Sequence, residues 1–484
     1  MPAGGVRGPA CTKLWAPAVR HRACTIDGVR GIEDPEGRCD VELELVRPLG
    51  KVFSRAFDPV SLLSRGARGF LVLNWMRLEP LTVSKDGRRE EGASVVELSS
   101  TGAPTRQCFA TSTGSSGSKT GIRDGALDAQ GRLALAGWVR GSGLDFGGES
   151  IAAPKGHRGS YLAVLTDSWK HAFSNALGGA TQNDATSVAF DAHGNVAVAG
   201  IFVGKFKLGD AELSAHDAAA LYVAKFDAGG RLAWVHVSPF SGRGVGPAVT
   251  FTDGGNVLVA GGYDQHLDFG TPLPAAAPLD LTGCSPEEQA TRKRLRMFLV
   301  ELDASGRQVR AESFGDPYAA ASDAATSPEG DLVATGMFRG RLALTGVPLE
   351  APAPRGACGC DIDCALPAVH FVARWDRQRK LAFRETLPGA TIVRATPGPV
   401  RSTVVEQGIP VSFRNAWGLR FADDYRWQLD LRSPSGRPAW SRSFEKLDLK
   451  ASATVGAERI AVLLHDPESS VLYLSIYRRR LTPP

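Results

Sequence analysis

Cysteine is the residue type of this chain that could do chemistry most directly, because a thiol can form a disulfide or bind a soft metal ion. The 484-residue sequence has eight cysteines. Four lie in the N-terminal quarter and four lie in two later segments: Cys11, Cys24, Cys39, Cys108, Cys284, Cys358, Cys360 and Cys364. The second group of four is the candidate site of the chain.

Three chemical states compete for Cys284, Cys358, Cys360 and Cys364. An even number of loop cysteines in an exported protein is typical of disulfides, which we favour. Free thiols are one alternative. A zinc site is another, because Cys360 and Cys364 have a spacing near that of zinc-binding pairs, although Cys358 and Cys360 stand closer than such pairs usually do. We assign no metal ligand and no cofactor to the chain.

Catalytic motifs are missing from the sequence: it has no Gly-x-Ser-x-Gly elbow, no His-Glu-x-x-His pair and no Gly-rich phosphate loop. The segment 263–268 offers Asp264 and His266 for acid–base work. The equivalent segments 202–207 and 338–343 carry no such groups, so 263–268 is interpreted as an ordinary connection. We therefore assign no catalytic residue.

Several aspartates recur at regular places, which raises the question of a calcium site. A calcium site needs several oxygen ligands that converge on one point. These aspartates instead occur one per turn, shortly before a Gly or a polar residue, which is typical of turn chemistry. They are Asp128, Asp191, Asp227, Asp303 and Asp376.

The elements that must position all these residues come from an internal repeat. A seven-residue phrase that begins and ends with Gly starts at Gly131, Gly194, Gly255 and Gly330, so its copies stand 63, 61 and 75 residues apart. Such a period is the signature of a repeat architecture. An Asp- and Gly-containing turn precedes most copies, and the phrase alternates in the manner of a strand.

Each repeat unit is predicted to contain four strands. In the second copy these are 196–200, 206–209, 221–226 and 232–236. Four short antiparallel strands in about 60 residues make one blade of a β-propeller. The sequence therefore predicts an all-β fold that is a single β-propeller.

Seven four-stranded blades are predicted, because first-strand patterns occur near residues 70, 133, 196, 257, 332, 404 and 460. The segment 41–57 supplies late strands of a blade and the segment 459–476 supplies early ones. Together they would complete one blade and close the ring, leaving few free edges. The predicted domains are an irregular N-terminal segment at 1–40 and the propeller at 41–484.

The repeat resembles the bacterial β-propeller repeats known as SBBP (seven-bladed β-propeller) repeats. The resemblance covers residues 93–390 through the Gly-x-Val-x-Val-Ala-Gly phrase, the Phe-x-Gly…Leu-Gly element and the Tyr-Val-Ala-Lys-Phe-Asp…Trp element. It implies a scaffold, in a family whose members are mostly secreted or surface-associated proteins of uncertain function. The unit at 391–445 departs from it by lacking the Val-Ala-Gly phrase.

Two insertions, at 272–295 and 348–368, interrupt the repeat and carry the candidate cysteines. They lengthen the same connection in consecutive units. That connection takes 14 and 12 residues in two units and 27 and 24 in the next two: 147–161, 209–221, 270–297 and 346–370. Equivalent loops of adjacent blades emerge on one face, so we expect the two insertions, and their cysteines, to lie side by side.

Composition sets limits on the partners. The net charge of +5 is slight for this length, and the basic run 292–296 follows an acidic pair, so nucleic-acid binding is not expected. No apolar run approaches the length of a membrane span. The first 40 residues do not form a signal peptide, yet the loop cysteines favour an extracellular or cell-envelope location. We expect a monomer.

The strong repeat and the weak chemistry favour a non-enzymatic scaffold that binds a protein, peptide or glycan through its loop face. The alternative is a propeller-type hydrolase or lyase with its site at the mouth of the central channel. An enzyme of that kind should gather two or more carboxylates or a histidine there, with shifted pKa values. A scaffold should present apolar or aromatic patches.

Overall fold

The computed structural model describes most of the repeat region and less of the two ends. The described residues are 10–13, 41–51, 61–74, 92–111, 119–141, 144–153, 157–177, 182–240, 246–264, 266–275, 285, 294–327, 329–346, 348–352, 368–387, 392–397, 403–416, 419–432, 435–436, 438–444, 453–455, 459–466 and 471–479. Within these ranges every regular element is a strand except the single 3-10 turn η1 (Gly66–Arg68). The all-β prediction is confirmed.

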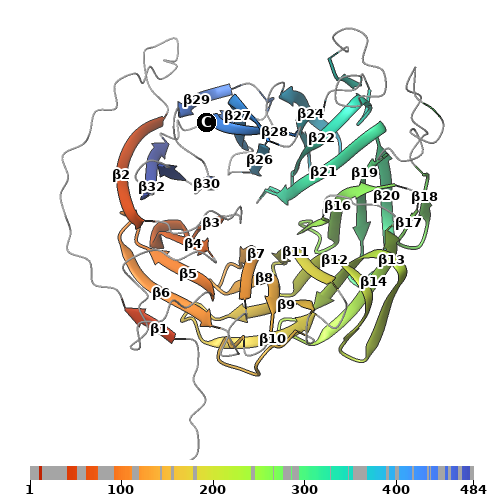
Figure 1. The fold of residues 1–484 in the computed structure, drawn as a ribbon, viewed down its shortest axis with the longest axis horizontal. Coiled ribbons are helices and arrows are strands. Elements are labelled where there is room, and N and C mark those ends of the chain that lie inside the picture. Colours follow the sequence, from red (N-terminus) through yellow and green to blue (C-terminus); the bar gives the residue numbers. More distant parts are fainter. Residues whose placement is uncertain are drawn as a thin grey trace, which may run out of the picture.

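The sheets follow one another in chain order around a common centre, which makes the molecule a β-propeller (Figure 1). Within each four-stranded unit the strands pair antiparallel with their neighbours in sequence. The first described unit also gains β1 from the N-terminal segment, a strand that the sequence did not indicate. This sheet contains β1 (Ala10–Lys13), β6 (Pro104–Thr111), β5 (Gly92–Leu98), β4 (Phe70–Asn74) and β3 (Ser61–Ser64), in that order.

The next two units share one eight-stranded sheet. Its strands are β7 (Lys119–Leu127), β8 (Leu133–Arg140), β9 (Arg158–Leu165), β10 (His171–Leu177), β11 (Gln182–Phe190), β12 (Val196–Leu208), β13 (Ala211–Phe226) and β14 (Leu232–Phe240). A single parallel pairing between Gln182 and Arg158 joins β11 to β9 and so links the two groups of four.

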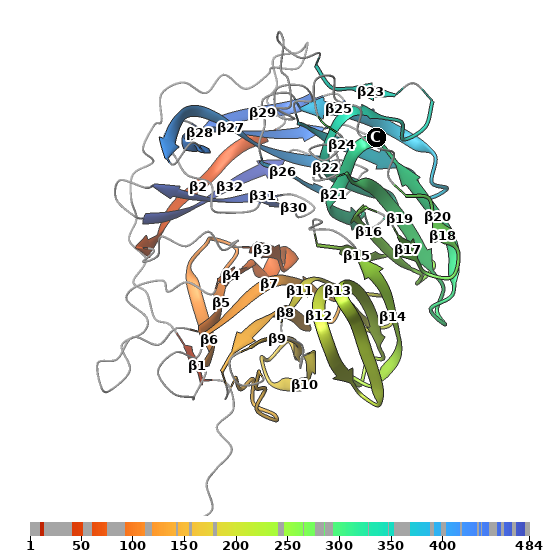
Figure 2. The same cartoon turned by 45° about the vertical axis from the view of Figure 1, so that its right-hand side comes forward.

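The following sheets continue around the ring from β14 (Figures 1 and 2). One contains β15 (Ala248–Phe251), β16 (Val257–Tyr263), β19 (Arg296–Leu302) and β20 (Gln308–Phe314), with β17 (Leu267–Asp268) and β18 (Pro272–Leu273) as a separate hairpin. The next contains β21 (Asp316–Thr326), β22 (Leu332–Leu342), β24 (Val369–Trp375) and β25 (Leu381–Leu387), with β23 (Leu349–Glu350) paired to β22. The last of these contains β26 (Ile392–Pro397), β27 (Thr403–Ala416), β28 (Leu419–Arg432) and β29 (Pro438–Phe444).

One sheet combines the two ends of the chain. Its order is β2 (Val41–Lys51), β32 (Val471–Arg479), β31 (Arg459–Asp466) and β30 (Ala453–Val455). Val41 is aligned with Arg479 and Lys51 with Val471 in an antiparallel pair. The predicted joining of 41–57 with 459–476 thus occurs as strand pairing, although 41–51 forms one outer strand rather than the two strands expected.

The number of separate sheets differs from the predicted seven. Among the described strands, hydrogen bonding separates five sheets of four or five strands, one of eight strands and the β17–β18 hairpin. The difference arises at Gln182 and Arg158, where one backbone bridge merges two repeat units into a single sheet.

The sequence predicted that the repeat phrase forms the first strand of each unit. In the structure it forms the second strand. The innermost strand precedes the turn that ends in Gly, as β11 precedes 191–194 and β21 precedes 327–330, and the sequence-based prediction missed it. These inner strands are rich in small residues because they crowd together at the centre: Ala319, Ala320 and Ala321 of β21 are all fully buried. Small residues carry a weak strand signal. The predicted second element is not a separate strand: residues 206–208 extend β12 and pair with β13, and Leu144 makes an isolated bridge with Ile151.

Both faces of the middle strands are buried because each sheet packs against a neighbour on either side. All seven residues of β16 are buried, and so are five consecutive residues at the start of β8. The clusters between sheets combine residues of adjacent units, as where Val164 and Phe173 of one unit pack with Val196 and Phe226 of the next. The core is therefore a series of packed interfaces between adjacent units, each of which we call a joint.

Two edges of the sheets differ in what connects the strands. We call turn edge the edge that carries tight hairpins, such as 191–194 between first and second strands and 227–230 between third and fourth. We call insertion edge the opposite one, where second strands connect to third strands, as at 209–210. At the turn edge Gly194 has φ +79° and its N–H donates to the carbonyl of Asp191. The predicted turn chemistry is confirmed at this edge.

Candidate functional site

The four candidate cysteines lie outside the described residues. Cys284 belongs to the first insertion, and Cys358, Cys360 and Cys364 belong to the second. Whether they lie near each other, and whether they form disulfides, therefore stays a prediction. Cys108, in contrast, is aligned with another cysteine, Cys11, in the antiparallel pair of β6 with β1.

The ends of the two insertions are described, and they place both at the insertion edge of neighbouring sheets. The first, 272–295, begins with β18 and ends before β19. The second, 348–368, contains β23 near its start and ends before β24. The two sheets touch where the first insertion ends, because Ala319 of β21 donates its N–H to the carbonyl of Leu295 at 2.7 Å.

A charged and aromatic cluster lies at the insertion edge between the second and third units. Nη2 of Arg158 is 2.8 Å from Oδ1 of Asp184, and Nε of Arg123 is 3.5 Å from the same atom. The guanidinium of Arg158 also lies over the ring of Trp138, 4.2 Å from its centroid. We call Arg123, Trp138, Arg158 and Asp184 the rim cluster. Its charged side chains are each roughly one quarter exposed, so a partner could reach them.

A buried polar network supports the rim cluster from below. Oγ of Ser160 lies 2.6 Å from Oδ1 of Asn183, and the amide of Asn183 donates to the carbonyl of Leu177. The hydroxyl of Tyr222 is 3.5 Å from Oγ of Ser160. Burial raises the pKa of Tyr222, so it stays a neutral hydrogen-bonding group. Ser160 and Asn183 neighbour Arg158 and Asp184 in sequence, so this network fixes the backbone that presents the rim.

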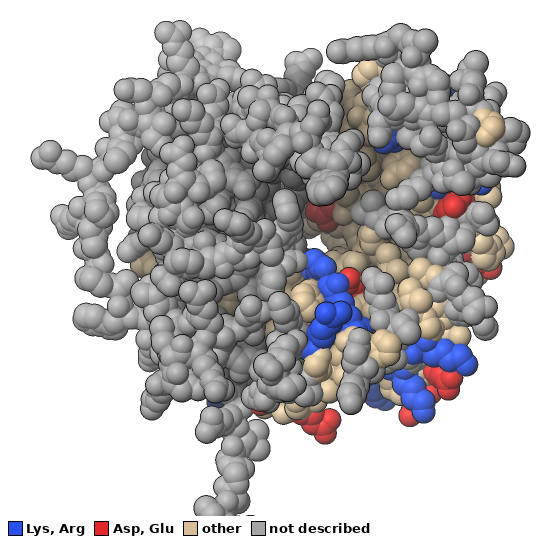
Figure 3. Space-filling model, in the orientation of Figure 1, with Lys and Arg blue, Asp and Glu red and all other residues tan. Residues whose placement is uncertain are grey.

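Two carboxylates stand on inner strands nearer the centre. Burial, and to a smaller extent the negative charge of Asp323, together raise the pKa of Asp124 to about 6, against hydrogen bonds that lower it. Asp124 belongs to β7 and Asp323 to β21, with β11 and β15 between them along the ring. Figure 3 shows the molecule hollowed at its centre, with Lys and Arg side chains along the wall. Asp124 and Asp323 are both half-buried.

Both carboxylates accept hydrogen bonds from backbone N–H groups. Asp124 accepts from the N–H of Val188 in the next unit at 2.9 Å and from Gly125 at 2.8 Å. Ser187 makes the equivalent contact in the following unit, where it accepts from the N–H of Val249 at 3.1 Å. Asp323 accepts from the N–H of Ala324 at 2.8 Å. Asp124 therefore ties two inner strands together, while Asp323 bonds within its own strand.

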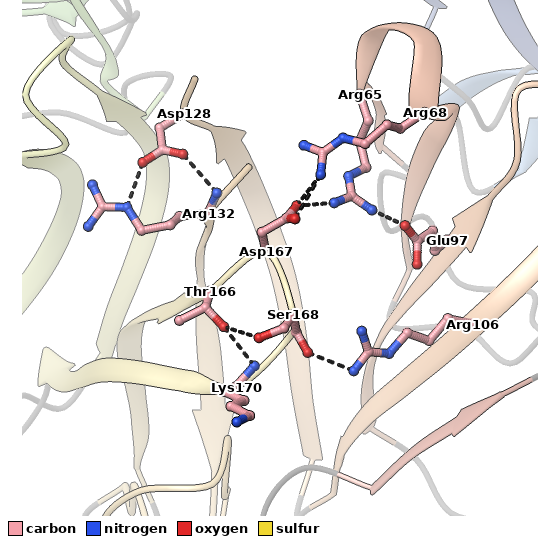
Figure 4. Close-up of polar contacts among 10 residues, drawn as sticks. All are labelled: Arg65, Arg68, Glu97, Arg106, Asp128, Arg132, Thr166, Asp167, Ser168 and Lys170. Atoms are coloured by element: carbon pink, nitrogen blue, oxygen red, sulfur yellow. Dashed lines mark hydrogen bonds and ion pairs between the residues drawn. The ribbon is translucent and has the colours of Figure 1, made fainter. Parts of the chain in front are cut away.

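Ion pairs and hydrogen bonds at the turn edge connect the first two described units (Figure 4). Arg65 pairs with both Glu97 of its own sheet and Asp167 of the next. Nη1 of Arg68 also lies 2.7 Å from Asp167. Partial burial raises the pKa of Asp167. Hydrogen bonds and positive charge from Arg68 and Arg65 outweigh it and hold that pKa below its usual range. This network is a joint between sheets, and no motif in the sequence pointed to it.

Residues beside Asp264 and His266, and the aspartate of the 191–194 turn, make contacts typical of connections and turns. In 263–268, Asp268 accepts from the N–H of Gly270 at 2.7 Å, and the hydroxyl of Tyr263 donates to the carbonyl of Pro274 at 2.6 Å. Asp191 likewise accepts from the N–H groups of its own turn. Over the described ranges, no group of three or more His, Cys, Asp or Glu residues is placed to hold a metal ion.

Comparisons with known proteins add a likeness of fold. No family model and no curated protein matches the chain. Solved structures do: a protein of unknown function from Dyadobacter fermentans is 13% identical, covers 81% of this chain and 99% of its own, and has a TM-score of 0.40. The Dos1 propeller is 10% identical, with 90% and 96% coverage and a TM-score of 0.38. In the described residues, no helix has the length and apolar character of a membrane span. The chain is a β-propeller by its own strand pairing, and these values carry nothing about its activity.

Proposed function

We propose that this chain is a non-enzymatic binding scaffold, a β-propeller that holds a protein, peptide or glycan at its insertion edge. The observation that carries the proposal is the position of the two insertions, which leave equivalent corners of two neighbouring sheets after β18 and β23. Loops that decorate a rigid frame are where repeat architectures place recognition. The rim cluster adds two guanidinium groups and an indole at the same edge.

The proposed frame is a closed ring of seven blades of the SBBP type. The eight-stranded sheet counts as two blades in this proposal, because only the pairing of Gln182 with Arg158 joins its halves. Support for closure comes from the inner strands, since β30 of the sheet that contains both chain ends contacts β26 on one side and β3 on the other. A rigid ring would present both insertions without the entropy loss of ordering a flexible platform.

We further propose an exported protein whose insertion cysteines form disulfides. A disulfide between Cys284 and a cysteine of 348–368, or one among Cys358, Cys360 and Cys364, would restrict the conformations of these loops. Mass spectrometry of a non-reduced digest tests this proposal, since peptides linked through Cys284, Cys358, Cys360 or Cys364 are expected. Recovery of all four as free thiols from oxidising conditions would contradict it.

Loop exchange tests the binding proposal with segments of the same chain. Residues 271–296 and 347–369 are each replaced by residues 210–220, the equivalent stretch of the third unit, which comprises residue 210 and the first part of β13. Each exchange should abolish capture of partners from cell-envelope extract or a glycan array, while the thermal transition stays within a few degrees of wild type. Arg231→Ala, at a side chain 89% exposed on the turn edge, is the matched control and should bind normally.

The opposite results are equally clear. Binding that survives both exchanges would place the partner elsewhere. Hydrolysis of a glycan or ester by the purified protein, lost in Asp124→Asn with the fold intact, would favour the enzyme alternative at the central acids.

A further inference from the structure

One position in the fourth strand recurs at the same register in six units: in one of them it is Trp440, aligned with Leu431, and in the other five the structure describes the packing around it. Each of these five residues is aligned with the penultimate residue of the third strand and faces the turn edge. Three of the five are aromatic and two are arginine: Arg106, Phe173, Trp234, Arg310 and Phe383, opposite Glu97, Val164, Lys225, Glu301 and Arg374.

Each aromatic side chain packs on a glycine in a turn of the next unit. Phe173 lies on Gly230 and Trp234 on Gly306, so close that a Cβ atom added to either glycine would come within 3 Å of the ring. Phe383 lies on Gly436 in the same way. All three glycines have φ between 84° and 87°, which favours glycine independently. Ring and glycine thus form one interlocking contact that seals the joint.

A fourth joint reaches the same result with the two roles exchanged. Its fourth-strand residue is Arg106 and its turn residue is Trp169, which has a positive φ of 66° without being glycine. The guanidinium of Arg106 lies 5.1 Å from the centroid of the Trp169 ring and donates to the carbonyl of Ser168 at 2.8 Å, the contact drawn in Figure 4. The ring comes from the turn in this case, and the joint is sealed again.

The fifth joint has an arginine on both sides. Arg310 stands where the aromatic residues stand, and Arg379, with φ 64°, stands where the glycines stand. A cavity of about 20 Å³ opens there between the sheets of β15–β20 and β21–β25. Its floor is apolar and includes Leu258, Leu332 and Trp375.

The cavity occupies the place that Phe173 fills in the sealed joint. Register makes the correspondence explicit, because Leu258, Glu301 and Arg310 form one cross-strand row, as Ala134, Val164 and Phe173 do. Leu332 is aligned with Trp375 as Val196 is with Phe226, and both of the latter pack with Phe173 in one buried cluster. Among the five joints that the structure describes, this one alone has no aromatic ring between its two partner positions.

The charges around the cavity suit a flat ring with an acceptor at its edge. Arg379 is 11% exposed, and within the described residues its Nε has no hydrogen-bond partner, with Oε2 of Glu301 at 4.0 Å. Arg310 is paired with Glu312 at 2.7 Å, and both lie at the rim, 41% and 36% exposed. Guanidinium groups stack on aromatic faces, and a phenol oxygen can accept from Nε.

We propose that this joint is a socket for an aromatic side chain of a partner polypeptide, with tyrosine preferred. The partner's ring would stand where Phe173, Trp234 and Phe383 stand in the sealed joints. A cavity of this size holds about one water, so the ring enters when the exposed Arg310–Glu312 pair swings aside. Surface ion pairs of this kind contribute little stability, which makes that movement easy. The socket lies at the turn edge and is independent of binding at the insertion edge.

Peptide binding by the full chain tests the socket. The probe is Gly-Gly-Tyr-Gly-Gly, followed by NMR or intrinsic fluorescence, with Gly-Gly-Ala-Gly-Gly as the peptide that lacks a ring. We expect millimolar binding of the tyrosine peptide, weaker binding of a phenylalanine peptide and none of the alanine peptide. Arg310→Phe combined with Arg379→Gly rebuilds the sealed joint and should weaken tyrosine-peptide binding at least tenfold. Arg231→Ala should leave it unchanged.

A second measurement covers failure of the double variant to fold. Crystals of the wild-type protein soaked with the tyrosine peptide should show its ring between Arg310 and Arg379. A ring found elsewhere, equal affinity for the tyrosine and alanine peptides, or unchanged binding by a folded double variant would each overturn the proposal.

Discussion

Two joints of the same ring solve one packing problem in opposite ways. Between the second and third units, Phe173 covers Gly230 and joins a fully buried apolar cluster. Between the fourth and fifth units, Arg310 faces Arg379 across a small cavity. The backbone register is the same in both, so the difference lies in the side chains alone. A repeat can thus keep its backbone arrangement while one joint lacks the aromatic ring that fills the others.

The largest expected effect separates the two joints by truncation. Phe173 is 9% exposed, and Phe173→Ala should lower the free energy of unfolding by about 3 kcal/mol, because it removes buried apolar surface and leaves a void. Arg310→Ala, at the equivalent register, should change it by less than about 0.5 kcal/mol, as is usual for an exposed ion pair. Urea denaturation of both variants measures the contrast. Equal losses would mean that the two joints are not different in kind.

Substitution of the turn residues of the two joints should give a smaller difference in stability. Gly230→Ala places a Cβ against the ring of Phe173 at a φ of 87°, so we expect a loss of about 2 kcal/mol. Arg379→Gly should stay within about 1 kcal/mol of wild type, since relief of its left-handed backbone offsets the lost contacts with Glu301 and Gly330. Thermal denaturation at matched concentration measures both. A tolerated alanine at Gly230 would show that the ring can move away.

The smallest effect concerns pH at the sealed joint, where Asp124 accepts from Val188. The pKa of Asp124 is about 6 in the folded protein and 3.8 as a free side chain. The folded state therefore takes up the proton first, so this group adds stability as pH falls through 6 and its contribution levels off near 4. Between pH 7.5 and 5 the wild type should gain about 1 kcal/mol relative to Asp124→Asn. A difference that is flat, or that falls toward pH 5, would remove the assignment.

Strong local signals explain which regions of the fold were predictable. The turn at Asp191 and Gly194 and the strand that follows at Val196 carry Asp, Gly and β-branched residues in positions where each has one structural use. The inner strands escaped prediction because Ala319–Ala321 and their equivalents are selected for small size at a crowded centre, and small residues do not alternate in hydrophobicity.

The joints could not be predicted for a different reason. Phe173 and Gly230 are in different units, and only the assembled ring brings them together, so no window of sequence shows their dependence on each other. Comparing the same register in successive units would have revealed it, because Trp234 and Gly306 repeat the pair. The rim cluster was missed likewise, since Arg158 and Asp184 meet only across two units. The insertion cysteines, which the sequence did single out, lie outside the described residues.

The sheet built from β2 and β30–β32 has a consequence for how the protein is made. Its outer strand belongs to residues 41–51 and its neighbour to residues 471–479, at opposite ends of a 484-residue chain. During synthesis the first of these must wait, unpaired, until nearly everything else has left the ribosome. Contacts of such high sequence separation form slowly. An exposed strand edge is therefore a hazard of the growing chain, and the nascent protein should depend on chaperones more than its regular middle units would suggest.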